Sequence, residues 1–197
     1  MTTATSSREE GWRTVDIVVT AVLGVAFGVV FAGWNTLTGA LFSGAVNPPA
    51  YLVSGLWLAP GVLAGLIIRK PGAAVFGEVV AAAVSAILGS MWGIDTILSG
   101  AIQGAGAELV FAVFLYRSHT LPVAMLAAAG AAVGEWLHDM PIYYPDLAFG
   151  VQLAIGAFML VSGIIIAGLG SWLLVRELAR TGVLAAFPSG REQQPEA

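Results

Sequence analysis

Three glutamates, Glu78, Glu108 and Glu135, stand inside long apolar stretches of the chain. An ionisable side chain in the middle of a bilayer costs about 2.5–3.5 kcal/mol on insertion scales, so it marks a functional site by default. Counted from the nearest basic flank, Glu78 and Glu108 lie about 12–14 Å from the same membrane edge on consecutive helices. Two carboxylates at one depth repel unless they share a proton, a cation or a hydrogen-bonding ligand. The spacing predicts that both line one ligand site; the alternative for each is a protonated glutamate bonded to main chain.

The helix face around Glu108 is open. Gly100 and Gly104 lie in line with it, so a ligand or a neighbouring helix can come close to the carboxylate. Gln103 lies about 140° around an ideal helix from Glu108 and is a weaker candidate for the same cavity.

A second polar group, Glu135, His138 and Asp139, falls at i, i+3 and i+4, on one helix face. Two carboxylates and one imidazole are too few for a complete metal site, so no metal is predicted. The group is interpreted either as the rim of a binding cavity or as an interfacial polar cluster.

Trp57 lies well inside an apolar stretch, one turn before Pro60. Proline frees a backbone carbonyl and kinks a helix, often next to a cavity. A tryptophan face near carboxylates suits a flat, cationic ring through stacking and cation–π attraction. A lipid-facing or core position is the alternative for Trp57.

The elements that carry these side chains are membrane spans. Of 197 residues, 58% are hydrophobic and only 10% are charged, whereas soluble domains carry about 25% charged residues. The chain has no cysteine, which leaves no disulfide or thiol chemistry. A span needs about 20 mostly apolar residues, and six stretches qualify: Val15–Trp34, Tyr51–Ile68, Ala73–Ser90, Thr96–Tyr116, Leu121–Leu137 and Ala148–Val175. The sequence predicts an all-α integral membrane protein with a six-helix domain over 14–176 and short cytoplasmic tails at 1–13 and 177–197.

The basic residues fix the orientation of the spans. If the chain crosses the membrane six times, all eight basic residues lie in segments on the same side of the membrane. They are Arg8, Arg13, Arg69, Lys70, Arg117, Arg176, Arg180 and Arg191. The positive-inside rule makes that side cytoplasmic. Both ends of the chain are therefore predicted in the cytoplasm, and the protein in the cell membrane.

Small residues recur at every fourth position in three of the spans. Such stripes let backbones approach closely in lipid. Packing within the chain is the interpretation for the third and sixth spans. For Gly24, Gly28 and Ala32 in the first span, docking to another membrane subunit is the alternative.

Several segments resemble the S component of an energy-coupling factor (ECF) vitamin transporter. They are Trp12–Ile17 with the glycine-rich run to Trp34 and Asn35, Ile68–Ala74, Gln103–Phe111 and the Glu135–Trp136 pair. The resemblance is strongest to the YkoE type, which is associated with thiamine and its hydroxymethylpyrimidine precursor, and it covers 12–176. Family members usually carry a further acid on the third helix, where this chain has Ser85.

The resemblance implies a six-helix, substrate-binding prokaryotic membrane subunit with no ATPase of its own and no bound cofactor. It would capture a vitamin from outside and dock, through the stripe Gly24, Gly28 and Ala32, on a T component driven by two cytoplasmic ATPases that use ATP. The expected substrate-binding residues are Glu78, Glu108, Trp57, Glu135 and Gln103, with Trp34, Asn35 and Tyr144 as rim or lid.

Two other classes of function compete with this one. A self-sufficient proton-coupled carrier could use Glu78 and Glu108 as a relay, although the six spans show no clear repeat between halves. An enzyme is disfavoured because His119 and His138 are the only histidines and form no His-Glu-x-x-His motif. No segment resembles a phosphate-binding P-loop, so ATP would have to act through partner chains.

Overall fold

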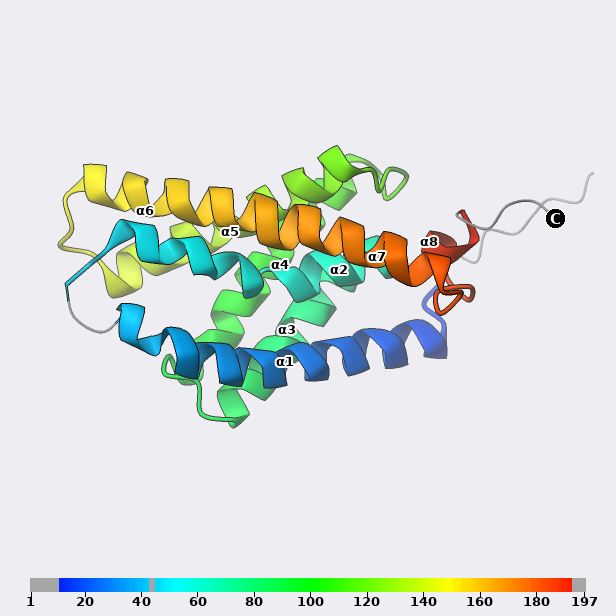
Figure 1. Ribbon diagram of the computed structural model, residues 1–197, viewed down its shortest axis with the longest axis horizontal. Coiled ribbons are helices and arrows are strands. Elements are labelled where there is room, and N and C mark those ends of the chain that lie inside the picture. The colour runs from blue at the N-terminus through cyan, green and yellow to red at the C-terminus, as the bar shows by residue number, and fades with distance from the viewer. Residues whose placement is uncertain (1–10, 43–44, 193–197) are drawn as a thin grey trace, which may run out of the picture.

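The computed structural model describes residues 11–42 and 45–192, and these fold into a bundle of helices (Figure 1). Two elements depart from the α-helix, the 3₁₀ segment η1 and the π-helical segment η2. The elements in chain order are α1 (Thr14–Phe42), η1 (Pro48–Leu56), α2 (Ala59–Ile68), α3 (Ala73–Ile87), α4 (Asp95–Val113), α5 (Leu121–Tyr143), α6 (Phe149–Ser162), η2 (Gly163–Gly170), α7 (Ser171–Arg180) and α8 (Pro188–Arg191).

The predicted six-span architecture is confirmed over the described residues. Five helical stretches are long and apolar enough to cross a membrane, and the sixth, α3, is a shorter apolar helix. The second span joins η1 to α2, and the last joins α6, η2 and α7. Prolines lie at the beginning of both η1 and α2, where a missing backbone N–H costs no helical hydrogen bond.

The first span is longer than predicted. It continues past Trp34 to Phe42, so the expected loop at Asn35–Ala50 is shorter, and Asn35 is helical. The hydroxyl groups of Thr36 and Thr38 donate to carbonyls one turn back, Thr38 to Trp34 at 2.7 Å. These polar side chains are thereby satisfied within the helix, which hydropathy alone does not reveal.

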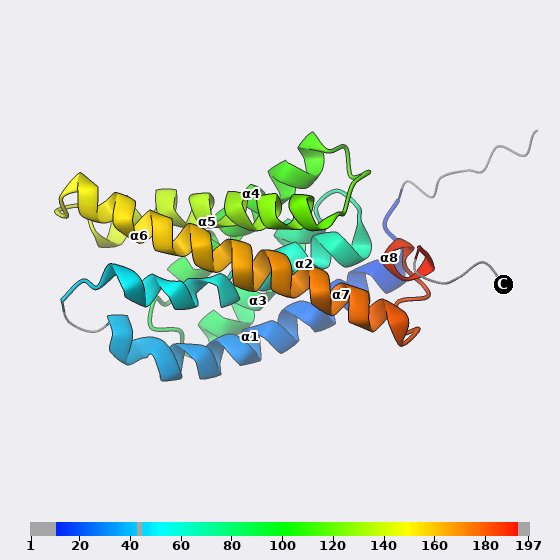
Figure 2. The same cartoon turned by 45° about the horizontal axis from the view of Figure 1, so that its top comes forward.

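The centre of the bundle is α2, every residue of which is buried. It contacts α1, α3, α4, α5, η2 and α7, which surround it in Figure 2. Glycines let neighbouring helices of the bundle approach closely. A Cβ on Gly106 of α4 would overlap the backbone of Gly130 on α5, and the reverse also holds. Close approach of this kind maximises van der Waals contact where lipid provides no hydrophobic drive.

The stripe on α1 packs inside the molecule. A Cβ on Gly24 would lie 2.7 Å from Val80 of α3, and one on Gly28 would lie 2.5 Å from Val84. The prediction that Gly24, Gly28 and Ala32 form an exposed docking surface is therefore wrong for the two glycines, while Ala32 is half-buried. In the third and sixth spans, Gly77 and Gly163 are likewise buried against neighbouring helices, in agreement with packing inside the chain at these two positions.

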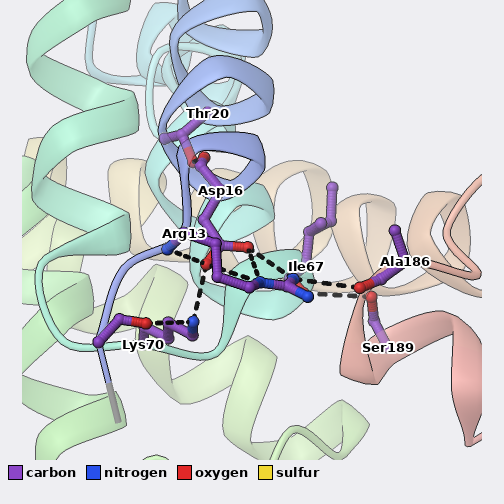
Figure 3. Close-up of polar contacts among 8 residues, drawn as sticks. Arg13, Asp16, Thr20, Ile67, Lys70, Ala186 and Ser189 are labelled. Carbon is purple, nitrogen blue, oxygen red and sulfur yellow. Dashed lines mark hydrogen bonds and ion pairs between the residues drawn. The ribbon is translucent and has the colours of Figure 1, made fainter. Parts of the chain in front are cut away.

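Both described ends of the chain lie at the same end of the bundle, as an even number of spans requires (Figure 1). The Arg13 guanidinium donates to the carbonyl of Ala186 at 3.1 Å, and the Ser189 hydroxyl donates to the carbonyl of Ile67 at 3.2 Å (Figure 3). The predicted carboxyl-terminal tail thus folds back under the bundle as far as residue 192. The prediction for Arg8, and those for 1–10 and 193–197, lie outside the described residues.

Asp16 joins the first span to the loop between the second and third (Figure 3). Its carboxylate accepts from the Arg13 guanidinium at 2.7 Å and from the Lys70 ammonium at 2.7 Å, and it is buried. Charge-assisted hydrogen bonds of this kind are about twice as strong as neutral ones. Through the hydrogen bond from Arg13 to Ala186, the cluster also holds the carboxyl-terminal segment at the cytoplasmic end.

We expect Asp16→Ala to lower the free energy of unfolding by about 2 kcal/mol, because two cations lose their shared carboxylate. Thermal unfolding followed by tryptophan fluorescence in detergent measures the change. Glu177→Ala is the matched control, since Glu177 pairs with Arg180 on the exposed face, where an ion pair contributes about 0.5 kcal/mol or less. Equal destabilisation by both variants would contradict a structural role for Asp16.

Candidate functional site

A cavity of about 70 Å³ lies in the half of the bundle away from the cytoplasmic end. Residues from α1, η1, α3, α4, α5 and the connecting loops enclose it. Carboxylates, small polar groups and aromatic rings line it together. The lining residues are Phe31, Asn35, Phe42, Tyr51, Trp57, Glu78, Ala82, Ser85, Trp92, Thr96, Ser99, Gly100, Gln103, Glu135, Asp139, Tyr143 and Tyr144.

Glu78 of α3 provides the first carboxylate of the cavity. It is 1% exposed, and its Oε2 atom accepts a hydrogen bond from the backbone N–H of Gly61 at 2.7 Å. That N–H belongs to the first turn of α2, where backbone donors lack helical partners. The other oxygen, Oε1, is buried without a hydrogen-bond partner among the described residues. Glu78 is therefore held by one oxygen and keeps the other available for a ligand.

Glu135 of α5 provides the second carboxylate. It is 4% exposed, and its Oε2 atom is also buried without a hydrogen-bond partner in the described part of the chain. A buried polar atom that makes no hydrogen bond costs free energy. The cavity thus combines two acids with unused acceptor atoms, but the pair is Glu78 with Glu135 rather than Glu78 with Glu108.

Glu108 lies elsewhere, which corrects the prediction that it shares a site with Glu78. Its carboxylate accepts from the backbone N–H groups of Gly72 at 2.6 Å and Ala74 at 2.9 Å, and from the Tyr116 hydroxyl at 2.8 Å. Burial, together with the hydrogen bond to Glu108, raises the pKa of Tyr116 to about 12. Glu108 does not line the cavity. It caps the amino end of α3, where unpaired N–H groups and the helix dipole favour an anion.

The register between α3 and α4 explains this difference. Gly104, not Glu108, lies level with Glu78, since a Cβ on Gly104 would lie 3.0 Å from the Cβ of Glu78. Glu108 is one turn closer to the cytoplasm and meets the first residues of α3. Gly72 there adopts a left-handed conformation with φ of +86°, which favours glycine. Gln103 does line the cavity, and its side-chain amide donates to the Ser99 hydroxyl at 2.9 Å.

Trp57 lines the cavity, as predicted, and is held in place by Asn35. Its indole N–H donates to the Asn35 side-chain oxygen at 2.9 Å. Its ring meets Trp92 edge to face with centroids 5.3 Å apart, and Phe42 lies 5.8 Å away. Phe42 and Trp92 also line the cavity and were not among the predicted site residues. Phe42 lies beyond the predicted end of the first span at Trp34, and Trp92 lies in the loop between α3 and α4.

The remaining predicted rim residues separate into two groups. Tyr144 lines the cavity, and its ring centroid lies 6.3 Å from that of Tyr51. Trp34 does not line it; its indole N–H donates to the carbonyl of Val53 at 3.2 Å and fastens η1 to α1. The prediction that Trp34 forms part of the rim is therefore corrected to a bracing role.

The group at the end of α5 forms a polar cluster at the cavity edge. His138 Nδ1 lies 2.9 Å from Asp139 Oδ1, and Nε2 lies 3.4 Å from Asp95 Oδ1. The Tyr143 hydroxyl donates to Asp95. Asp139 and Tyr143 line the cavity. Within the ranges the structure describes, no group of three or more His, Asp or Glu side chains is arranged to hold a metal ion.

A six-span bundle that encloses a small cavity of carboxylates and aromatic rings in its outward half is the architecture of a substrate-binding membrane permease component. Residues 15–134 match the family described as "ABC-type cobalt transport system, permease component". The chain is 36% identical over 185 residues to the "Putative HMP/thiamine permease protein YkoE" of Bacillus subtilis (strain 168), covering 93% of this chain and 92% of that protein.

A solved structure agrees with these matches. It is described as "Crystal structure of an S-component of ECF transporter", is 33% identical, and superimposes with a TM-score of 0.85 over 92% of this chain and 93% of that one. The chain therefore belongs to the S components of ECF transporters and is of the YkoE type. It is a multi-pass protein of the cell membrane.

Proposed function

We propose that this S component captures thiamine or its hydroxymethylpyrimidine precursor from outside and delivers it with a T component and two cytoplasmic ATPases. One observation carries the proposal: Glu78 and Glu135 line the same cavity, and each keeps a buried carboxylate oxygen without a hydrogen-bond partner among the described residues. A ligand with hydrogen-bond donors or positive charge would satisfy both atoms at once.

The chemistry of thiamine suits these surroundings. Its aminopyrimidine ring has an exocyclic amino group that donates hydrogen bonds to carboxylates, and its thiazolium ring is positively charged. The rings of Trp57 and Trp92 can stack on a flat heterocycle or attract a cation. The hydroxymethylpyrimidine precursor keeps the amino group and lacks the cation. The description of the Bacillus subtilis relative, which names both compounds, supports the same substrate class.

The size of the cavity implies movement at its mouth. Its volume is about 70 Å³, while pockets for drug-sized ligands usually measure about 300–1,000 Å³. The aromatic side chains around it must therefore separate to admit a two-ring ligand. Trp92 and Tyr144 lie next to the loops after α3 and α5 and are the side chains best placed to move.

Calorimetric titration of the purified chain, without partners, tests the proposed substrate class. We expect saturable one-to-one binding of thiamine, of hydroxymethylpyrimidine or of both, and none of riboflavin, a vitamin that has neither the aminopyrimidine nor the thiazolium. No binding of thiamine or its precursor, in a preparation shown to be free of carried-over ligand, would refute this substrate class.

The energy source needs a separate experiment. In liposomes that contain only this chain, we expect a proton gradient to give no accumulation of labelled thiamine. Addition of the T component and both ATPases should make uptake depend on ATP. Accumulation driven by the proton gradient alone would instead establish a self-sufficient carrier.

A further inference from the structure

A second cavity, of about 160 Å³, lies at the cytoplasmic end of the bundle. The end of α2, the loop between α4 and α5, α7 and the carboxyl-terminal segment surround it. None of its residues belongs to the substrate cavity. They are Leu66, Arg69, His119, Trp172, Val175, Arg176, Ser189 and Glu192.

Two arginines give this cavity its charge. Arg69 has a side chain only 14% exposed and pairs with Glu192, whose side chain is 64% exposed. Arg176 places its guanidinium 5.5 Å from the centre of the Trp172 ring, and no ion pair found among the described residues includes it. The lining therefore carries two fixed positive charges against one carboxylate, and that carboxylate is on an exposed side chain.

His119 adds a neutral hydrogen-bonding group. Its Nε2 atom is buried without a hydrogen-bond partner in the described ranges. Burial and the nearby Arg69 lower the pKa of His119 to about 4, so the imidazole is uncharged at neutral pH. A neutral imidazole can still donate one N–H to an oxygen atom. Arginines and a nearby ring donor are the groups that recognise phosphate oxygens.

We propose that this cavity binds the phosphate group of an anionic lipid from the cytoplasmic leaflet, with the phosphate replacing the Glu192 carboxylate on Arg69. The exposed side chain of Glu192 can leave without opening the core. Ser189 remains fixed by its hydrogen bond to Ile67, so only the last residues of the described segment need to move (Figure 3).

The position of the cavity favours a lipid over free phosphate. Leu173, next to Trp172 on α7 and about 60° around the helix from Arg176, is apolar and exposed, which provides a surface for an acyl chain beside the charged group. Tryptophan is enriched at the membrane–water interface. Basic pockets between transmembrane helices on the cytoplasmic side are typical sites for anionic headgroups.

Native mass spectrometry of the full chain in detergent tests the proposal, with phosphatidylglycerol and phosphatidylcholine as probes and inorganic phosphate as a separate arm. We expect phosphatidylglycerol to bind at least tenfold more tightly than phosphatidylcholine. Arg176→Gln should remove that preference, while Glu192→Gln should strengthen it by freeing Arg69 from its internal acid. Arg180→Gln is the control, since Arg180 pairs with Glu177 on the exposed surface, and it should keep the preference.

Thermal unfolding of the same variants in detergent shows whether each one is folded, independently of the proposed substrate. Equal binding of the two lipids by the unaltered chain, or an unchanged preference in a folded Arg176→Gln variant, would overturn the proposal. If inorganic phosphate binds the cavity as tightly as phosphatidylglycerol does at the same concentration, the assignment to a lipid would be overturned.

Discussion

Glu78→Gln is expected to weaken thiamine binding about 100-fold and to leave the unfolding temperature nearly unchanged. The amide oxygen of glutamine can still accept the hydrogen bond from Gly61, so the fold keeps this contact. The other position becomes an NH₂ group, which neither accepts from the ligand amino group nor offsets a positive charge. Removing one partner from a buried charged hydrogen bond costs about 2–5 kcal/mol, which corresponds to roughly 30-fold to several-thousand-fold in affinity.

Calorimetric titration of the purified variants measures this effect. Glu177→Gln makes the same chemical change on an exposed side chain and serves as the control, with unaltered affinity expected. If Glu78→Gln binds thiamine as tightly as the unaltered chain, Glu78 does not contact the ligand.

Glu108→Ala should instead affect stability and leave binding unchanged. We expect the free energy of unfolding to fall by about 3 kcal/mol and the thiamine affinity of the folded molecules to stay the same. The substitution leaves the N–H groups of Gly72 and Ala74 and the hydroxyl of Tyr116 without their acceptor. Loss of a helix cap costs about 0.5–2 kcal/mol, and unsatisfied buried donors add to that cost. Glu108 does not line the substrate cavity, so the ligand loses no contact.

Chemical or thermal unfolding in detergent gives the stability, and titration of the folded fraction gives the affinity. Glu177→Ala again controls for loss of an exposed carboxylate. A Glu108→Ala variant of normal stability that fails to bind thiamine would show that the acid acts on the substrate instead of on α3.

The span count and orientation could be predicted because they depend on quantities that the sequence carries directly. Runs of apolar residues give the spans, and the position of Arg69, Lys70 and Arg117 relative to those runs gives the sidedness. The sequence also indicates candidate site residues within the spans. Glu78 and Glu135 are conspicuous because burying a charge in a membrane is costly, and Trp57 is conspicuous because it precedes a proline inside an apolar stretch. All of these features belong to single helices and do not depend on how the helices pack together.

The parts that could not be predicted depend on how two helices pair. The register that sets Gly104 beside Glu78, and Glu108 beside the first turn of α3, comes from side-chain packing between helices. The partner of the stripe at Gly24 and Gly28 is α3 for the same reason. Hydropathy and small-residue spacing show that such contacts exist and do not identify the surface that makes them.

Helix capping also explains why Glu108 has a different role from Glu78. Both Glu78 and Glu108 accept from backbone N–H groups at the beginning of a neighbouring helix, α2 and α3 respectively. Glu78 uses one oxygen for this contact, while Glu108 uses both. An acid whose two oxygens both accept from backbone N–H groups has a capping role, whereas an acid with one unused oxygen can bind a ligand. How many backbone N–H groups each acid meets depends on where the neighbouring helix begins.

The central claim is that a small heterocycle binds between the aromatic rings and the two acids of the outward cavity. A ligand-bound structure of the chain with thiamine tests it most directly. We expect the aminopyrimidine or thiazolium within hydrogen-bonding or ionic distance of Glu78 Oε1 or Glu135 Oε2, with the ring packed on Trp57 or Trp92. Thiamine bound outside this cavity, with both carboxylates as they are in its absence, would contradict the account.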